Sequence, residues 1–103
     1  MQIGMIGLGR MGAAMVRRLM GAGHDCVVYD PNPEPVAGLA TDGATPAASL
    51  SEFAAALTPR RVVWVMVPAG VVGAVVDELS PLLERGDIVI DGGNSYYRDD
   101  MAQ

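Results

Sequence analysis

The chain has 103 residues, half of them hydrophobic, and a net charge of −5; all seven of its basic residues are arginine. This composition excludes disorder and suffices for one domain with its own core. The acidic balance and the scattered arginines exclude a basic face for nucleic acid. An uncharged stretch from Val62 to Val76 is interrupted by Pro68 and is too short to span a membrane as a helix.

The first expected elements are an apolar strand over residues 2–6, a glycine-rich turn, and a helix with an apolar stripe at Met11, Met15 and Leu19. The turn has the pattern Gly7-Leu8-Gly9-Arg10-Met11-Gly12. In such a loop the first glycine permits the turn, the second lets a pyrophosphate approach the backbone, and the third lets the helix pack on the strand. The pattern predicts a dinucleotide-phosphate site served by the free N–H groups of the helix. The alternative is that the glycines only make a tight turn.

A second strand is expected over residues 26–29, and it ends at Asp30. A carboxylate at this position can accept hydrogen bonds from the adenosine ribose of NAD. It would also repel the 2′-phosphate of NADP, because Pro31 and Asn32 provide no basic side chain to offset it. The sequence therefore favours NAD. The alternative is that Asp30 only caps the following turn.

The next elements are a short helix opening at residues 31–34 and running to Leu39, and a very short strand at 44–46. Ser49-Leu50-Ser51-Glu52 has the spacing of a capping box and predicts a helix that ends near Thr58.

Residues 62–67 form an apolar, β-branched run typical of a central parallel strand, and residues 68–70 break it. A helix follows, and we expect five of its residues to face the sheet: Val71, Val72, Val75, Val76 and Leu79. A turn at 80–83 and a strand at 87–91 complete the pattern, and residues 98–103 have a weak helical tendency.

Strands and helices alternate with short connections, which predicts the α/β class: a Rossmann-type doubly wound parallel sheet with helices on both faces. The single domain, residues 1–103, is shorter than the about 150 residues such a fold usually occupies, so we expect a fragment of a longer protein. The carboxyl ends of parallel strands share one edge. The glycine loop, Asp30, residues 67–70 and residues 91–95 should therefore converge on one crevice.

Other polar or reactive residues are expected to be structural. The single cysteine, Cys26, cannot form an internal disulfide and should be buried, which fits a reducing cytoplasm. His24 lies at a helix-to-strand turn and should be a surface or capping residue. The pairs Arg17-Arg18 and Arg60-Arg61 are expected on the solvated surface. No basic segment precedes the first strand, so we expect no secretory signal.

Three motifs together resemble the amino-terminal domain of the decarboxylating 6-phosphogluconate dehydrogenases: Gly7 to Gly12, Met66-Val67-Pro68-Ala69-Gly70, and Ile90-Asp91-Gly92-Gly93-Asn94-Ser95-Tyr96-Tyr97-Arg98-Asp99. The third motif is the specific one. The first two are shared with other β-hydroxyacid dehydrogenases, such as 3-hydroxyisobutyrate dehydrogenase, whose equivalent strand ends in Asp-Ser-Ser/Thr. The resemblance covers the whole chain but only about the first third of a typical family member.

The resemblance implies a set of cofactor contacts. Residues 7–12 would hold the pyrophosphate, with Met11 near the nicotinamide, and Asp30, Pro31 and Asn32 would lie at the adenosine ribose. Val67, Pro68 and Ala69 would line the cofactor further along, and Asn94 would contact both nicotinamide and substrate. Members that use NADP carry Asn-Arg-Ser/Thr in place of Asp30-Pro31-Asn32 and Lys in place of Pro68, so the resemblance implies NAD.

The family reaction oxidises 6-phosphogluconate by hydride transfer and releases CO2 to give ribulose 5-phosphate in the pentose phosphate pathway, without a metal. The resemblance places its lysine base and glutamate acid beyond residue 103, and this chain contains no lysine. We therefore expect no catalytic residue and no activity within this chain. The substrate would be 6-phosphogluconate, and the longer enzyme would be a cytoplasmic homo-oligomer with no nucleic-acid or membrane partner.

Two alternatives remain open. One is a β-hydroxyacid dehydrogenase with another substrate, against which Asp91-Gly92-Gly93-Asn94-Ser95 argues. The other is a non-enzymatic dinucleotide-binding module. A longer reading frame with a Ser-Gly-Gly loop and a Lys-x-x-x-Asn-x-x-Glu pattern would favour the enzyme.

Overall fold

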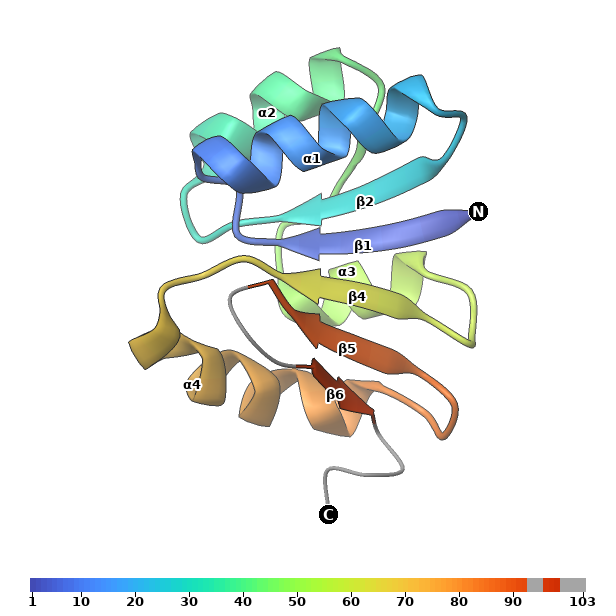
Figure 1. The fold of residues 1–103 in the computed structure, drawn as a ribbon, viewed down its shortest axis with the longest axis vertical. Coiled ribbons are helices and arrows are strands. Elements are labelled where there is room, and N and C mark those ends of the chain that lie inside the picture. Colours follow the sequence, from blue (N-terminus) through green and yellow to red (C-terminus); the bar gives the residue numbers. More distant parts are fainter. Residues whose placement is uncertain (93–95, 99–103) are drawn as a thin grey trace.

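The computed structural model describes residues 1–92 and 96–98. Its strands form one sheet in the order β3-β2-β1-β4-β5-β6 (Figure 1). The elements in chain order are β1 (Gln2–Ile6), α1 (Arg10–Gly21), β2 (Asp25–Tyr29), α2 (Pro33–Thr41), β3 (Thr45–Pro46), α3 (Leu50–Ala56), β4 (Val62–Val65), α4 (Ala69–Leu79), the 3-10 turn η1 (Ser80–Leu82), β5 (Ile88–Asp91) and β6 (Tyr96–Arg98).

Strands β1 to β5 are mutually parallel, which confirms the predicted fold class. The chain moves outward from β1 to β3 and then returns to place β4 on the other side of β1. The strand order therefore reverses between β1 and β4, and this reversal is where α/β sheets of this kind bind ligands.

The end of the chain departs from expectation. β6 pairs with β5 in the antiparallel sense, whereas Arg98 was expected to begin a helical segment. The physical reason is the length of the connection: β5 ends at Asp91 and β6 begins at Tyr96, and a parallel crossover needs about a dozen residues or more. Residues 99–103 lie outside the described part of the chain.

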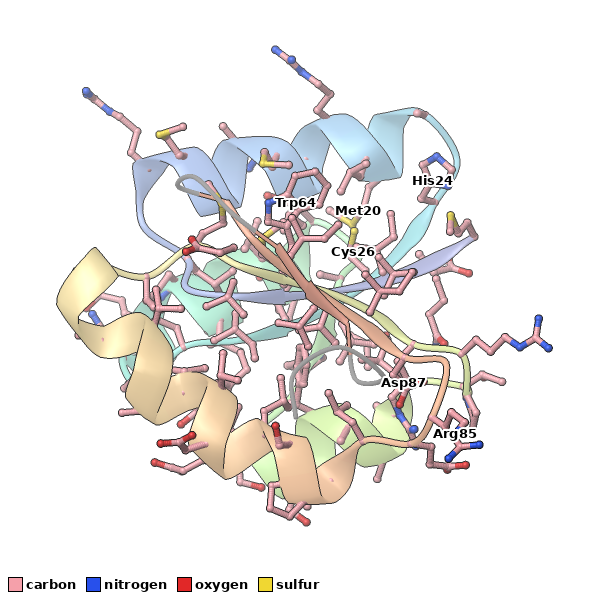
Figure 2. All side chains as sticks on the ribbon, turned by 60° about the horizontal axis from the view of Figure 1, so that its bottom comes forward. Met20, His24, Cys26, Trp64, Arg85 and Asp87 are labelled. Atoms are coloured by element: carbon pink, nitrogen blue, oxygen red, sulfur yellow. The ribbon has the colours of Figure 1, made fainter. Side chains whose placement is uncertain are left out.

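Each face of the sheet has its own core. Ile6, Val27, Val63 and Val65 pack against α3 and α4, while the alternate residues of the same strands pack against α1 and α2. Figure 2 shows Met20, Cys26 and Trp64 between α1 and the sheet. Cys26 is buried as predicted, and this burial raises the pKa of its thiol, so the side chain stays neutral.

Side-chain caps explain where two helices begin. The Asn32 side chain accepts a hydrogen bond from Glu34 N–H at 3.1 Å and starts α2. Ser49 Oγ accepts one from Glu52 N–H at 3.1 Å and starts α3, which confirms the predicted cap. The reciprocal bond of Glu52 goes to the N–H of Ala48, one residue earlier than in the standard capping box.

Two predicted apolar stripes need correction. In α1 the fully buried residues are Gly12 and Val16; Met15 and Leu19 are half-buried against the same core as predicted, but Met11 is 67% exposed. In α4, Val71 is exposed, whereas Val72 and Leu79 are buried. Neighbouring helical residues point about 100° apart, so a helix that buries residue 72 against the sheet turns residue 71 outward.

Arg61 is buried, contrary to the prediction of a solvated arginine pair. Its guanidinium lies 2.9 Å from Asp87 Oδ2 and its Nε donates to Ala54 O at 3.0 Å. The Asp87 side chain, just before β5 (Figure 2), is fully buried and accepts two further bonds, from the N–H groups of Arg61 and Glu84. This cluster joins the end of α3 to the starts of β4 and β5, on the edge opposite the glycine loop.

The cluster predicts a pH dependence of stability. Burial raises the pKa of Asp87, but hydrogen bonds from Glu84 and Arg61 and the Arg61 charge outweigh it, so the pKa lies below its usual value. This stabilisation is present above the unfolded-state pKa of about 3.9 and is lost as the pH falls through the lower folded-state pKa. We expect the urea midpoint to fall below about pH 4, and to fall less steeply in Asp87→Asn. Equal slopes in both proteins would contradict this assignment.

Candidate dinucleotide-binding site

The glycine loop is held tightly between the ends of β2 and β4. Gly7 has φ 93°, and its N–H donates to Tyr29 O at 3.0 Å. A Cβ on Gly7 would lie 2.6 Å from Met66 O, and a Cβ on Gly12 would overlap the Gly7 carbonyl oxygen. Both glycines are therefore required by the fold itself.

Gly9 differs from its two neighbours in the motif. Its φ of −67° and ψ of −169° suit any residue, and a Cβ there would meet no atom within 4 Å. The fold does not require glycine at this position. A tight turn alone therefore explains why residues 7 and 12 are glycines, but it does not explain Gly9. Because Gly9 has no side chain, the space in front of α1 stays open.

In the two helices on either side of the strand-order reversal, no side chain caps the backbone N–H groups of the first turn. α1 and α4, which follow β1 and β4, have no side-chain cap and no acidic residue in the first turn. In contrast, α2 and α3 have both. The N–H groups in the first turn of α1 therefore remain available, with their partial positive charge, to an anion in the space beside Gly9.

Asp30 joins the loops that follow β1 and β2. The side chain is half-buried; Oδ2 accepts from Leu8 N–H at 2.7 Å and Oδ1 accepts from Asn32 N–H at 2.8 Å. Asp30 thus caps the turn, as the alternative interpretation proposed. A carboxylate offers about four acceptor positions, so about two remain for ribose hydroxyls. The ribose contact stays a prediction.

The other predicted residues differ in their surroundings. Arg10 and Met11 are exposed, Leu8 is buried in the core under α1, and the Asn32 side chain caps α2. Pro31 is exposed beside Asp30. Val67 is half-buried, Pro68 is the N-cap of α4, and Ala69 is the first residue of that helix. Asn94 lies outside the described residues.

Four strand ends approach one another, as the parallel sheet predicts. The glycine loop contacts the end of β2 through the hydrogen bonds of the Gly7 and Leu8 N–H groups. It contacts the end of β4 where Gly7 approaches Met66 and Val67. After β5, Gly92 N–H donates to Val65 O at 2.9 Å. His24 lies at the far end of α1 (Figure 2), away from this edge.

Sequence reasoning missed Met66 and a cavity beside Asp30. The Met66 backbone touches the Gly7 position and its sulfur fills the space where a Gly92 side chain would lie. The cavity has a volume of ≈ 720 Å³ and includes no residue of the glycine loop. Its walls are Tyr29, Asp30, Pro31, Pro33, Val36, Ala37, Ala40, Pro46, Ala47, Ala48 and Glu52. The residues around Pro46 are small, and they form no sequence motif that would have predicted the wall of a cavity.

Within residues 1–92 and 96–98, the structure contains no group of three side chains suited to a metal ion. Over the same residues, no helix is long and apolar enough to cross a membrane.

Comparison with known families matches residues 2–102 to the NAD binding domain of 6-phosphogluconate dehydrogenase. The chain belongs to this family. The NAD(+)-dependent, decarboxylating 6-phosphogluconate dehydrogenase of Haloferax volcanii is 45% identical over all of this chain and 35% of its own length. The enzyme of the same name from Bacillus subtilis is 37% identical over 94% of this chain and 22% of its own length. The chain thus spans about a third of the first relative and less of the second.

Solved structures agree with the fold of this domain. The 3-hydroxyisobutyrate dehydrogenase of Mycobacterium tuberculosis superposes with a TM-score of 0.73 at 30% identity, covering 87% of this chain and 30% of that one. An imine reductase of Bacillus cereus superposes with a TM-score of 0.74 at 23% identity, covering 86% and 30%, and shows the fold alone.

Proposed function

We propose that residues 1–103 are the cofactor domain, at the amino terminus, of an NAD-dependent decarboxylating 6-phosphogluconate dehydrogenase. The observation that carries the proposal is the open space at Gly9 in front of the uncapped α1, in a chain that belongs to this family. An anion in that space would accept hydrogen bonds from the N–H groups of the first turn of α1, because Gly9 has no side chain to keep it away.

NAD is the cofactor that this arrangement favours. Its diphosphate would lie against residues 9–12, and its adenosine ribose would use the remaining acceptor positions of Asp30. The half-buried carboxylate would repel the additional phosphate of NADP, and the relatives from Haloferax volcanii and Bacillus subtilis are named NAD(+)-dependent. The mostly apolar cavity beside Asp30 suits the adenine ring.

When bound, NAD would supply the hydride acceptor for the oxidation of 6-phosphogluconate at C3, and the residues of this domain would position it. The chain contains no lysine, so the base of the family reaction would come from a part of the enzyme outside it. Asn94, which follows β5, is proposed to contact both nicotinamide and substrate. We further propose a cytoplasmic homo-oligomer without nucleic-acid or membrane partners.

Calorimetric titration and an activity assay test the proposal. We expect the 103-residue chain to bind NAD at least about tenfold more tightly than NADP, because Asp30 repels the 2′-phosphate. A full-length protein containing this domain should reduce NAD with 6-phosphogluconate and not with 3-hydroxyisobutyrate, while the chain alone should have no activity. Tighter binding of NADP would contradict the proposed cofactor. Turnover by the chain alone would contradict the location of the base outside this chain, and a preference for 3-hydroxyisobutyrate would contradict the proposed substrate.

A further inference from the structure

The backbone N–H of Leu8 has no neighbouring strand to bond with. The chain leaves the sheet at Gly7, whose N–H makes its bond to Tyr29 O and whose positive φ then turns the backbone. Leu8 is only 3% exposed, so water has little access to it. A buried N–H group needs an acceptor, and here that acceptor cannot be part of the sheet.

The acceptor is a side chain that lies 22 residues further along the sequence. Asp30 Oδ2 is 2.7 Å from Leu8 N, while Oδ1 is 2.8 Å from Asn32 N. Hydrogen bonds to an ionised carboxylate are stronger than those between neutral groups. One side chain therefore joins the glycine loop after β1 to the turn after β2.

We propose that Asp30 is a positioning residue for the glycine loop. Its carboxylate fixes the path of residues 7–12 before any ligand binds, so that the first turn of α1 is already directed at the crevice. Only the benefit to dinucleotide affinity rests on the proposed function, because a loop ordered in advance binds with less loss of entropy. The same side chain would then determine both the shape of the glycine loop and the choice between NAD and NADP, whose adenosine ribose carries a 2′-phosphate.

Residue-resolved amide hydrogen exchange of the 103-residue chain, without cofactor, tests the positioning role. In Asp30→Ala we expect the Leu8 amide to exchange about tenfold faster or more. The amides of Gly7 and Met66 should not change, because their acceptors are the backbone oxygens of Tyr29 and Ile6. The control is Asn32→Ala, which removes the α2 cap but keeps both bonds of Asp30, and it should leave Leu8 protected.

Two results would overturn the positioning role. One is an unchanged Leu8 exchange rate in Asp30→Ala. The other is equal acceleration at Gly7, Leu8 and Met66, which would mean that the carboxylate stabilises the whole fold rather than the loop.

Titration with inorganic pyrophosphate, which has no ribose, tests the benefit to affinity. Loss of a negative charge should by itself strengthen pyrophosphate binding. A weakening of several-fold in Asp30→Ala would show that the loop has lost its shape, whereas equal or tighter binding would overturn the link to affinity. If the wild-type chain binds neither pyrophosphate nor NAD, the proposed function fails, while the Leu8 exchange rates still decide the positioning role.

Discussion

Replacing Gly9 by alanine is expected to weaken NAD binding by about 100-fold or more while leaving the fold intact. The added methyl group meets no protein atom within 4 Å, and the backbone angles of Gly9 suit alanine. The methyl would instead occupy the space proposed for the diphosphate and lengthen its hydrogen bonds to the first turn of α1. Each bond to a charged group contributes about 1.5–3 kcal/mol, so two weakened bonds account for the loss.

Two other glycines provide the controls for Gly9→Ala. Gly12→Ala should lose both stability and NAD binding, because its Cβ would overlap the Gly7 carbonyl oxygen. Gly21→Ala, at the exposed end of α1, should preserve NAD affinity and raise the melting temperature slightly. Calorimetric titration and thermal unfolding of the three variants measure both effects. Wild-type affinity in Gly9→Ala would show that the open space is not the phosphate site.

The second large effect is expected at Asp87. Asp87→Ala should lower the free energy of unfolding by about 3–5 kcal/mol, because the buried guanidinium of Arg61 loses its buried carboxylate at 2.9 Å and keeps only the exposed Glu84 carboxylate at 3.5 Å. The N–H groups of Arg61 and Glu84 lose the same acceptor. Urea unfolding measures the loss. The variant protein that remains folded should bind NAD with the same affinity as the wild-type protein, since Asp87 lies on the edge opposite the glycine loop.

An exposed ion pair of nearly the same length is the matched control. The distance from Arg17 Nε to Asp42 Oδ2 is 3.0 Å, against 2.9 Å in the buried pair, but its side chains are 57% and 45% exposed. Asp42→Ala should therefore cost only about 0–1 kcal/mol. Equal losses in Asp42→Ala and Asp87→Ala would mean that burial does not determine the contribution of these pairs.

The features that could be predicted from the sequence depend on neighbouring residues. The predicted cap at Ser49 acts over three positions, and apolar runs rich in β-branched residues, such as Val62–Val65, determine the strands. The glycine spacing indicated the loop correctly for the same reason. Met15 and Leu19 do pack against the core, but the placements of Met11 and Val71 were wrong because helical periodicity gives the width of an apolar face and not its exact direction relative to the sheet.

The amino-acid sequence by itself determined the order of strands and helices as far as β5, the glycine loop and the acidic residue after β2, since each depends on short-range geometry. Only the tertiary structure decided that Asp30 accepts from Leu8, that Arg61 is buried against Asp87 and that β6 is antiparallel. The two side-chain contacts join residues 22 and 26 positions apart. Their partners are selected by the packing of the sheet, which no local pattern in the chain specifies.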